Sequence, residues 1–426
     1  MQAIINPSYF NGNLKAPASK SYSQRAFAAA LLHVGKTEIL NAGSSNDEIA
    51  ALNIIINLGA TILYNNNNNN KILIESLGVL PISDSFNCAE SGLCSRLFTP
   101  IAAISNQLIS INAEGSLLKR KMVGFDSVFK QLEIEIKDFN GYLPLQINGP
   151  LIAKNISVDA QNGSQFLSGL LFALSNVALE PINIFVKELK SKPYIDLTLE
   201  VLEKIGILIT HDNYKKFYIN PLNFKKPEDP VKLNVEGDWS SAAYMLVAAA
   251  LTGRATIENL NLNSVQADKA ILNILKDCGA LIKVEKESIT VSKAPLRNFT
   301  FDATDCPDLF PVLSILAAGI SGMSSINGLH RLLDKESNRI ISICAMLNSF
   351  DVPFLLKDDT LQITGGGIIK NCAIDTFNDH RITMAASIGA IMANGKVIIN
   401  NIESVKKSYT GFFTDLIASN IKCEIV

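Results

Sequence analysis

Six segments of the chain are long, rich in alanine and almost wholly apolar, and each of them begins with polar residues. A surface helix would carry its polar residues along one face, so this pattern predicts helices that are buried on all sides. The six predicted helices begin at Ser23, Ser95, Ser164, Ser240, Asp308 and Asp379.

The predicted buried helices recur about every 70 residues, an interval too long for a solenoid repeat. Each helix is followed by a short apolar run that predicts a strand, then by a more amphipathic helix, and in most copies by a Gly or Asn turn into another strand. In the first copy the asparagine run 65–70 lies between two strand-like runs and predicts the tip of a hairpin. The pattern predicts six copies of an α/β unit, each with one buried and one half-exposed helix.

The six copies divide into two sets of three. The polar stretch 221–230, which contains three prolines, separates the third copy from the fourth and predicts a linker. A second crossing is expected near residues 11–15, because the first twelve residues precede the first copy. We therefore expect two domains, one formed by 13–230 and the other by 1–12 together with 231–426. Two domains also suit the length of 426 residues, since single cores rarely grow beyond about 250–300 residues.

Composition narrows the possible partners. The chain has 38 Lys and Arg against 40 Asp and Glu, so no basic excess favours nucleic acid. The longest apolar stretch, 166–179, is too short to span a bilayer, and the first residues do not resemble a secretory signal. Seven scattered cysteines without a Cys-x-x-Cys pair indicate reduced thiols, and four distant histidines do not have metal-ligand spacing. We expect a cytoplasmic protein without a membrane or nucleic-acid partner.

The polar helix starts predict an anion-binding site. A helix N-terminus presents free N–H groups and a partial positive charge, so it attracts anions. Lys20, Arg25, Arg96 and Arg381 lie at or beside the predicted starts, where a cation opposes the helix dipole unless an anion offsets it. The alternative for the Ser and Asp residues is ordinary N-capping. We expect the helix starts to converge on a cleft between the domains.

Eleven motifs occur in the order typical of one enzyme family. They include 19-SKSYSQR-25, 92-GLCSR-96, 114-EGSLLKRKM-122, 163-GSQFLSGLL-171, 191-SKPYIDLTLE-200, 237-GDWSSAAYMLVAAA-250, 335-KESNR-339, 378-NDHRITMA-385 and 406-KKSYTGFF-413. With these motifs the chain resembles the 5-enolpyruvylshikimate-3-phosphate synthase family over essentially its whole length. The order of the motifs makes chance similarity implausible.

The resemblance implies a fold and a reaction. The fold is a two-domain inverse α/β barrel in which each domain has three βαβαββ repeats. The reaction transfers the enolpyruvyl group of phosphoenolpyruvate to the 5-hydroxyl of shikimate 3-phosphate and releases phosphate. The family needs no cofactor and no metal, its partners are these two small molecules, and we expect a monomer. Because each half of the chain carries only part of the implied site, we expect substrate to draw the halves together.

The resemblance also implies roles for particular residues. The implied catalytic residues are Asp308, as the base on the 5-hydroxyl, with Glu336 and Lys20 in proton transfer. The implied shikimate 3-phosphate site comprises Lys20, Ser21, Arg25, Ser164, Gln165, Ser191, Tyr194, Asp308 and Lys335. The implied phosphoenolpyruvate site comprises Lys20, Gly92, Arg120, Gln165, Arg339, Arg381 and Lys407.

The sequence departs from the usual family pattern near these residues. An acid stands where the family usually has Asn, an aliphatic residue replaces a Thr, a glycine replaces one of two serines, and an amide replaces an Asp. Other departures are a lysine in place of a proline and an alanine in place of a glycine. In the order in which they are described above, these residues are Glu90, Leu93, Gly163, Asn338, Lys121 and Ala18.

Other interpretations stay open at this stage. UDP-N-acetylglucosamine enolpyruvyl transferase shares the fold, but it has Lys-Asn in place of Lys20-Ser21, and a cysteine in a loop that corresponds to the cysteine-free 111–122. A non-catalytic anion-binding relative would not need the whole acid–base set. At the level of single residues, Asp308 could be an N-cap, Arg96 an ion-paired helix residue and Tyr194 a core residue.

Overall fold

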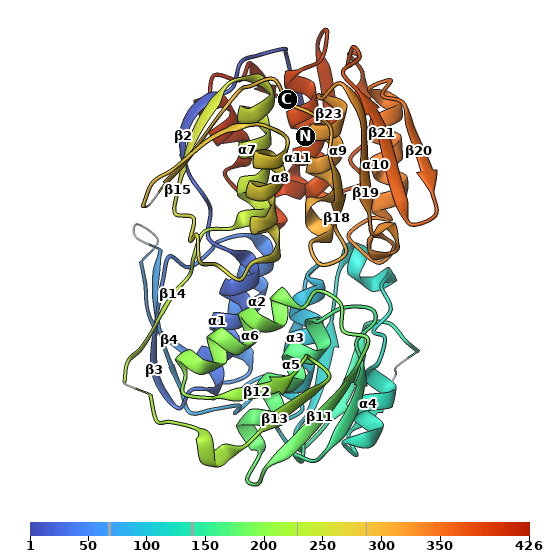
Figure 1. Cartoon of the computed structure of the whole chain (residues 1–426). Helices are drawn as coiled ribbons and strands as arrows, with labels where there is room; N and C mark the ends of the chain where they lie inside the picture. Colours follow the sequence, from blue (N-terminus) through green and yellow to red (C-terminus); the bar gives the residue numbers. More distant parts are fainter. Residues whose placement is uncertain (67–69, 138–139, 228, 287) are drawn as a thin grey trace. The chain divides into compact units, whose positions relative to one another are not determined.

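The computed structural model describes residues 1–66, 70–137, 140–227, 229–286 and 288–426, which form two compact units (Figure 1). We call Ala18–Glu236 the continuous unit, because it is a single stretch of chain. We call Met1–Pro17 together with Gly237–Val426 the discontinuous unit.

The described residues of the continuous unit form three four-stranded sheets, ordered β14-β3-β5-β4, β6-β7-β9-β8 and β10-β11-β13-β12. Its elements are α1 (Lys20–Leu32), β3 (Gly35–Leu40), α2 (Asn46–Asn57), β4 (Thr61–Asn66), β5 (Lys71–Ser76), β6 (Ser85–Asn87), α3 (Gly92–Ala102), β7 (Leu108–Asn112), η1 (Gly115–Lys119), α4 (Phe125–Gln131), β8 (Glu135–Lys137), β9 (Leu145–Asn148), β10 (Ile156–Asp159), α5 (Gln165–Val177), β11 (Ile182–Lys187), α6 (Pro193–Lys204), β12 (Ile209–Asp212), β13 (Lys216–Ile219), η2 (Pro221–Asn223) and β14 (Val231–Asn234).

The described residues of the discontinuous unit form three further four-stranded sheets, ordered β16-β17-β15-β2, β18-β19-β21-β20 and β22-β23-β1-β24. Its elements are β1 (Gln2–Ile5), β2 (Asn11–Lys15), α7 (Trp239–Thr252), β15 (Arg254–Glu258), η3 (Ala267–Ala270), α8 (Ile271–Asp277), β16 (Leu281–Val284), β17 (Ser288–Ser292), β18 (Thr300–Asp302), η4 (Pro307–Leu309), α9 (Phe310–Ala318), β19 (Gly322–Asn327), η5 (Leu329–Leu332), α10 (Arg339–Ser349), β20 (Phe354–Lys357), β21 (Thr360–Gly365), β22 (Ala373–Ile374), α11 (His380–Ile391), β23 (Val397–Asn400), η6 (Ile402–Lys407), α12 (Phe412–Ala418) and β24 (Cys423–Ile425).

The six sheets share one pattern. In each sheet one edge strand pairs in parallel with its neighbour, as β6 does with β7 and β2 with β15, and the remaining pairs are antiparallel, as in β7 with β9 and β8 with β9. A parallel pair needs a crossover connection, which the buried helix supplies in the copies built on α3, α5, α9 and α11, whereas antiparallel neighbours need only a turn. The prediction of six βαβαββ copies is confirmed.

Three strands come from distant parts of the chain. Strand β14 pairs in parallel with β3, and β2 pairs in parallel with β15, so the two strands that lead into α1 and α7 are exchanged between copies. Strand β1 pairs with β23 and β24 and completes the sixth copy. Because of this exchange the units change over at 17/18 and 236/237, C-terminal to the changes at 12/13 and 230/231 expected from linker composition.

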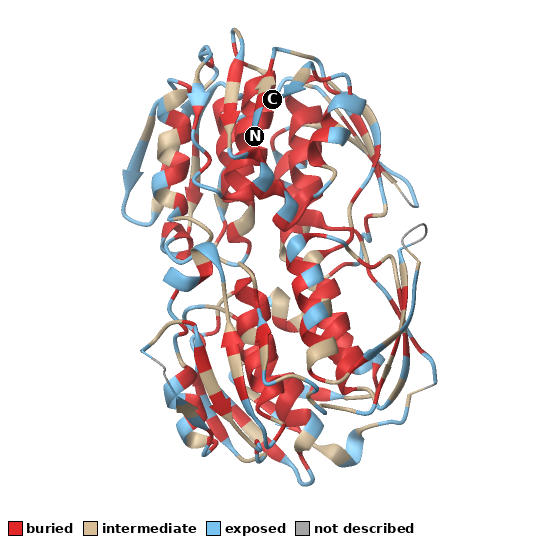
Figure 2. Ribbon diagram, turned by 180° about the vertical axis from the view of Figure 1, so that it is seen from behind, coloured by how far each residue is buried: buried red, intermediate tan, exposed pale blue. Residues whose placement is uncertain are grey.

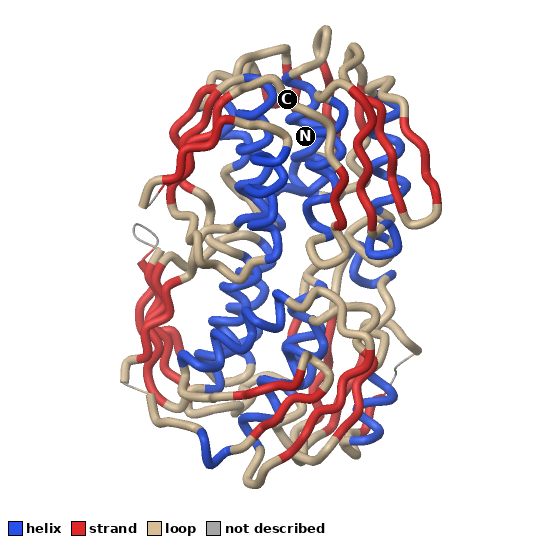
Figure 3. Tube along the Cα trace, viewed as in Figure 1, coloured by secondary structure: helices blue, strands red, loops and turns tan. Residues whose placement is uncertain are grey.

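Within each unit the long apolar helices, α1, α3 and α5 in one unit and α7, α9 and α11 in the other, lie inside, and the sheets lie outside (Figure 3). All residues of α7 are buried, and α1 is buried from Tyr22 to Leu32. The strands alternate instead, so that β5 has every second residue buried. Figure 2 shows the buried residues concentrated on the inner helices, and the predicted buried helices are therefore confirmed.

Three helices begin earlier than predicted. Helices α1, α3 and α7 begin at Lys20, Gly92 and Trp239, so the predicted starts Ser23, Ser95 and Ser240 lie within the first turn or two. The N-caps are Ser19, Ser91 and Asp238, and each accepts a hydrogen bond from the backbone N–H three residues further on. Several polar residues precede each apolar run, and an early one of them is the N-cap, so the helix begins before the residue at which it was predicted to begin.

The remaining starts agree with the prediction more closely. Ser164 and Asp379 are the N-caps of α5 and α11. Asp308 lies in the short 3-10 turn η4, and α9 begins two residues later at Phe310. Strands β4 and β5 form an antiparallel pair, and Asn65 and Asn66, predicted as part of the hairpin tip 65–70, lie at the end of β4. Residues 67–69 of the predicted tip lie outside the described residues. No helix in the described part of the chain is long and apolar enough to cross a membrane.

Candidate active site

The predicted site residues divide between the two units. The continuous unit holds Lys20, Ser21, Arg25, Gly92, Arg120, Ser164, Gln165, Ser191 and Tyr194, and the discontinuous unit holds Asp308, Lys335, Glu336, Arg339, Arg381 and Lys407. We describe the two groups separately.

Lys20 is fixed at the N-terminus of α1. Its Nζ lies 2.9 Å from Oδ2 of Asp47, in the first turn of α2, and the side chains are 14% and 8% exposed. A carboxylate that is mostly removed from water holds an ammonium group in one position more firmly than a surface pair does. No local sequence pattern marks Asp47 as the partner of Lys20, because the contact joins two helices.

Arg25 joins three helices rather than reaching into solvent. Its Nε donates to Thr198 Oγ1 (2.8 Å), its Nη1 to the backbone oxygen of Ser21 (2.8 Å), and its Nη2 to Ser168 Oγ (3.3 Å) and the oxygen of Tyr194 (3.2 Å). The side chain is 1% exposed, and this burial lowers the pKa of Arg25 to about 10. The structure therefore gives Arg25 a part in fixing α1, α5 and α6, and its contact with a substrate phosphate stays a prediction.

The helix starts of the continuous unit are neighbours. Gln24 Nε2 donates to Ser91 Oγ (3.3 Å), which links the start of α1 to that of α3. Arg96 Nη1 donates to Gln165 Oε1 (3.4 Å), which links α3 to the first residue of α5. With the Arg25 contacts to α6, four helix starts lie together, and their backbone N–H groups form a site suited to anions.

Two guanidinium groups face Gly92. A Cβ at Gly92 would lie 2.8 Å from Nη1 of Arg120, 2.8 Å from Nη1 of Arg96 and 3.8 Å from Oε1 of Gln165. Arg96 is held by the backbone oxygens of Gly92 (3.1 Å) and Lys121 (3.0 Å). Two like charges above a helix N-terminus repel each other, so this arrangement favours an anion between them. We call Gly92, Arg96 and Arg120 the arginine cradle.

Gly92→Ala should weaken the cradle without unfolding the protein. The new Cβ would displace the ends of two flexible side chains, so we expect the KM for the anionic substrate at the cradle to rise roughly 10-fold or more. The check is steady-state kinetics with both substrates, alongside thermal unfolding. Gly367→Ala is the control, because a Cβ there meets nothing within 4 Å. An unchanged KM in Gly92→Ala would exclude close contact between the cradle and substrate.

In the discontinuous unit, Asp308 lies between two arginines. Its Oδ1 accepts from Arg339 Nη1 (2.7 Å) and its Oδ2 from Arg381 Nη2 (2.8 Å), while Lys335 Nζ lies 3.9 Å from Oδ1. Burial alone would raise the pKa of Asp308, but the charges of Arg381, Lys335 and Arg339 outweigh it and hold this pKa below its usual range. Asp308 is therefore an ionised bridging carboxylate. The N-cap interpretation is not supported, because the Asp308 carboxylate contacts these cations and α9 begins at Phe310.

Arg339 binds three carboxylates. Besides Asp308 it donates to Asp379 through Nε (2.9 Å) and Nη2 (3.3 Å), and to Glu336 Oε2 through Nη2. Arg339 is 1% exposed. Burial opposes its charge, but Asp379, Glu336 and Asp308 raise the pKa of Arg339 well above its ordinary value. The guanidinium is thus permanently charged and fixes the position of Glu336.

Arg381 retains donors that have no partner. It is 4% exposed, and its Nε and Nη1 are buried without a hydrogen-bond partner among the described residues. An unsatisfied buried donor costs about 1–3 kcal/mol, more when charged, so such donors mark a place for a ligand. Its backbone is held by Asp379, which accepts from Arg381 N (2.9 Å), and by Tyr244 Oη, which donates to Arg381 O (3.3 Å).

Two lysines complete this group. Lys407 Nζ donates to the backbone oxygen of Asn378 (2.8 Å), in the motif that precedes α11. Burial lowers the pKa of Lys335 to about 8, although Asp308 opposes this shift. Lys335 therefore changes charge just above neutrality.

A buried acid beside the group was not singled out from the sequence. Asp268, in η3, is 1% exposed and accepts a hydrogen bond from Ser240 Oγ. Burial, and then the charge of Asp308, raise the pKa of Asp268. No local pattern marks it, since its neighbours come from other helices.

Glu336, Asp379 and His380 bring one possible metal-ligand atom each to within 4.8 Å of one another. Arg339 already donates to both carboxylates. The cluster is therefore explained by the guanidinium that it binds, and we do not interpret it as a metal site.

Two of the departures have local explanations. Asn338 is the N-cap of α10 and accepts from Ile341 N (3.4 Å), a role in which Asn serves as well as Asp. Gly163 has φ of 134°, which a serine would adopt only with strain. Leu93 is buried in the first turn of α3, and nothing in the structure explains why it replaces a hydroxyl residue.

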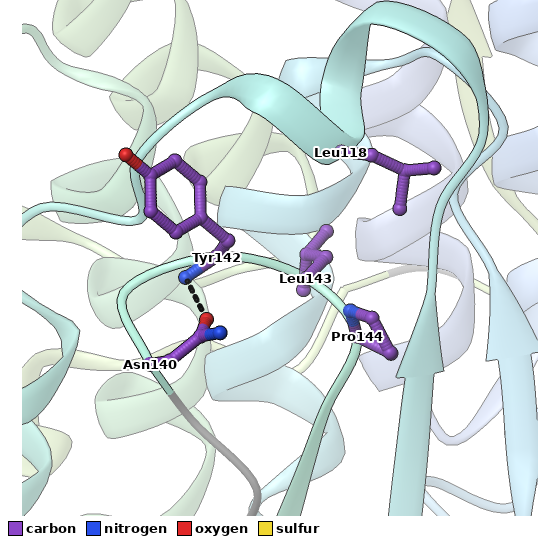
Figure 4. A pocket seen from close by; sticks show the side chains of 5 residues that line it. All are labelled: Leu118, Asn140, Tyr142, Leu143 and Pro144. Carbon is purple, nitrogen blue, oxygen red and sulfur yellow. Dashed lines mark hydrogen bonds between the residues drawn. The ribbon is translucent and has the colours of Figure 1, made fainter.

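A hollow of about 520 Å³ lies in the continuous unit. Figure 4 shows its lining, Leu118, Asn140, Tyr142, Leu143 and Pro144, with a hydrogen bond from Tyr142 N to Asn140 Oδ1 (3.3 Å). None of the predicted site residues lines it. We therefore do not assign substrate to this hollow.

The fold and the two groups of side chains define an α/β enzyme that acts on small anionic substrates. The family model for EPSP synthase (3-phosphoshikimate 1-carboxyvinyltransferase) matches residues 4–416. The chain belongs to this family. The predicted enzyme class, 3-phosphoshikimate 1-carboxyvinyltransferase, is thereby confirmed, as is its place in aromatic amino acid biosynthesis.

Relatives from distant organisms are similar over nearly the whole chain. The 3-phosphoshikimate 1-carboxyvinyltransferase of Clostridium perfringens (strain SM101 / Type A) is 36% identical over 417 residues, 97% of each chain. That of Thermococcus kodakarensis is 35% identical over 414 residues, 97% of this chain and 98% of the relative. The solved structure of EPSP synthase from Acinetobacter baumannii is similar with a TM-score of 0.83 at 24% identity, covering 100% of both chains, and it supports the fold.

Proposed function

We propose that the two groups of side chains act on one pair of substrates, shikimate 3-phosphate and phosphoenolpyruvate. A bond forms between the 5-hydroxyl oxygen and C2 of phosphoenolpyruvate while C3 gains a proton. Loss of a proton from C3 then restores the double bond as the bond from C2 to the phosphate oxygen breaks. The products are the enolpyruvyl ether and inorganic phosphate.

The observation that carries this proposal is Asp308 between two buried arginines, Arg339 and Arg381. Two donors of Arg381 find no partner in the part of the chain that the structure describes. Arginine forks match carboxylates and phosphates, and each substrate carries both kinds of anion. We assign Arg381 and Arg339 to phosphoenolpyruvate, together with Lys407. In the continuous unit we assign the arginine cradle to the same substrate.

The same contacts suggest how the base is activated. Without substrate, the arginines hold the pKa of Asp308 low, which makes it a weak base. A substrate anion on Arg381 and Arg339 offsets their charge, so the basicity of Asp308 rises when substrate is in place. Asp308 then accepts the proton of the 5-hydroxyl. Glu336, fixed by Arg339, and Lys20, fixed by Asp47, transfer the proton at C3.

The remaining assignments concern shikimate 3-phosphate. We assign Ser21, Ser164, Gln165, Ser191 and Tyr194 to this substrate, because they lie at the neighbouring starts of α1, α5 and α6. Arg25 supports the same starts from within, and Lys335 supplies a cation from the discontinuous unit. We further propose that the protein is a cytoplasmic monomer.

A second enolpyruvyl acceptor is the main alternative. The enolpyruvyl transferase NikO from Streptomyces tendae is similar in structure with a TM-score of 0.77 at 15% identity, so the fold alone does not select the acceptor. The family match and Ser21, where the UDP-N-acetylglucosamine enzymes have Asn, favour shikimate 3-phosphate.

The test is a phosphate-release assay with both substrates and with each omitted in turn. We expect phosphate only when both are present. Release with UDP-N-acetylglucosamine in place of shikimate 3-phosphate, at a comparable rate, would reject the proposed acceptor. Release without any acceptor would reject the transfer reaction.

The charge of Lys335 predicts a pH effect on shikimate 3-phosphate. Its ammonium is present below about pH 8 and is lost as the pH rises through this value. We therefore expect kcat/KM for shikimate 3-phosphate to fall above about pH 8, because the cation that meets the substrate disappears. Lys335→Met should have low kcat/KM already at pH 7 and lack this step, and Lys335→Arg should keep its charge and move the step to higher pH. The same alkaline step in Lys335→Met would show that another group causes it.

A further inference from the structure

We propose that Glu90 is a positioning residue for Arg120: its carboxylate docks the segment 113–120 against the N-terminus of α3 and so holds the Arg120 guanidinium over Gly92. The inference rests on the proposed assignment of the arginine cradle to phosphoenolpyruvate. It gives a role to an acid that stands where the family usually has an amide.

The docking contact is direct. Glu90 Oε2 accepts a hydrogen bond from the backbone N–H of Ser116 (2.9 Å). The carboxylate also packs on Gly115, where a Cβ would lie 2.5 Å from Glu90 Cδ and 2.6 Å from Oε2. Gly115 has φ of 51°, so the backbone turns at the point where the carboxylate covers it. A Cβ at 115 would therefore have to displace the Glu90 carboxylate.

The contact closes a row of hydrogen bonds between the two segments. Cys88 N donates to Asn112 O (2.9 Å), and Glu114 N donates to Ala89 O (2.8 Å). Asn87 Nδ2 donates to Glu114 Oε1 (2.6 Å). The first two contacts continue the backbone pairing of β6 with β7, and the contacts of Asn87 and Glu90 add side-chain hydrogen bonds between the same two segments.

Glu90 and Ser116, the two residues of the contact, are each close in sequence to a residue of the arginine cradle. Glu90 is two residues before Gly92, the first residue of α3. Ser116 lies in the 3-10 helix Gly115–Lys119, whose C-cap is Arg120, and Arg120 N donates to Leu117 O (3.1 Å). Leu117 is 0% exposed, so the short helix is anchored on one side by this leucine and on the other by Glu90. A shift at Ser116 would therefore move Arg120 relative to Gly92.

The negative charge of Glu90 is unfavourable for binding an anion nearby, so its presence needs an explanation. A carboxylate close to an anion site repels the substrate, and an amide at this position would avoid the repulsion. A charged acceptor, however, makes a stronger hydrogen bond to a backbone N–H than a neutral acceptor does. The docking contact explains why the acid is present.

The test compares Glu90→Ala and Glu90→Gln by steady-state kinetics with each substrate. We expect Glu90→Ala to raise the KM for phosphoenolpyruvate about 10-fold while the KM for shikimate 3-phosphate changes less than about twofold. Glu90→Gln keeps an oxygen that can accept from Ser116 N, so its KM for phosphoenolpyruvate should stay within about threefold of the wild type. Equal impairment in both variants would reject the hydrogen bond as the cause.

A double-mutant cycle shows whether Glu90 acts through Arg120. In an Arg120→Ala background, Glu90→Ala should raise the KM for phosphoenolpyruvate no further, and additive effects would overturn the proposal. If Arg120→Ala alone leaves this KM unchanged, the assignment of the cradle is wrong. If Arg120→Ala raises it and Glu90→Ala does not, only the role of Glu90 is wrong.

A matched control separates positioning from general loss of a carboxylate. Asp229 Oδ1 accepts from the backbone N–H of Lys36 (2.9 Å), the same kind of contact in the same unit. It lies near the C-terminal end of α1, away from the helix starts. Asp229→Ala should leave both KM values unchanged, and a rise in the KM for phosphoenolpyruvate equal to that of Glu90→Ala would overturn the proposal.

Discussion

Asp308→Asn should lower kcat by about 10² or more, the usual scale for the loss of a positioned base. The amide keeps the size of the side chain but cannot take the proton of the 5-hydroxyl. It also leaves Arg339 and Arg381 without the negative charge between them, so we expect some loss of stability as well. The measurement is kcat at saturating substrates, with the folded fraction determined by circular dichroism at the assay temperature.

The control for this prediction is Asp379→Asn. Asp379 is a second carboxylate partner of Arg339, and it caps α11, a role that Asn also fulfils. It contacts Arg339 from another side and is not assigned to the reacting hydroxyl. If Asp379→Asn lowers kcat as much as Asp308→Asn does, the loss arises from a loosened Arg339 and not from a missing base. A kcat within a few-fold of the wild type in Asp308→Asn would also contradict its assigned role.

Arg339→Met should destabilise the discontinuous unit by roughly 3–5 kcal/mol, the scale for removing one partner of a buried ion pair. Methionine fills much of the volume but leaves Asp308, Glu336 and Asp379 without their shared cation. The like charges of these carboxylates then repel one another. Activity should also be lost, because the Arg339 guanidinium assigned to phosphoenolpyruvate is missing. Denaturant unfolding with fluorescence or circular dichroism provides the free energy.

A surface ion pair provides the contrast. Lys370 and Asp351 lie 2.7 Å apart, but their side chains are 60% and 62% exposed. Lys370→Met should change the free energy of unfolding by less than about 1 kcal/mol, because water screens an exposed pair. Similar small effects in both variants would mean that the three carboxylates around Arg339 are tolerated without it.

The parts of the fold that the sequence predicted are those encoded by local pattern. The apolar run of α7 could only be a buried helix, and its recurrence in five other places predicted the six copies. The exchange of β2 and β14 could not be predicted, because each strand leads into one helix but pairs beside another. The hydrophobic periodicity of a strand indicates which of its faces is buried, but it does not indicate which strand lies next to it in the sheet.

The same distinction applies to the site. The motif resemblance predicted that Asp308 and Arg339 belong to the site. It did not predict the hydrogen bond between them, which joins residues in different helical segments. The contact of Lys20 with Asp47 and that of Arg339 with Asp379 depend on how helices pack. Charged residues of opposite sign are common in any sequence, so composition could not have selected these pairs.

The exchange of strands has a consequence for how the protein is made. All of the continuous unit has been synthesised once residue 236 has left the ribosome. Strands β1 and β2 precede this unit in the chain, but among the described strands they pair with β15, β23 and β24, which follow it. Gln2 N donates to Val426 O (2.8 Å), so the two chain ends lie side by side. A circularly permuted chain that joins these ends and opens between 236 and 237 would pass through each unit once. In that order β1 and β2 would be synthesised after β15 and β23 and within the same uninterrupted unit.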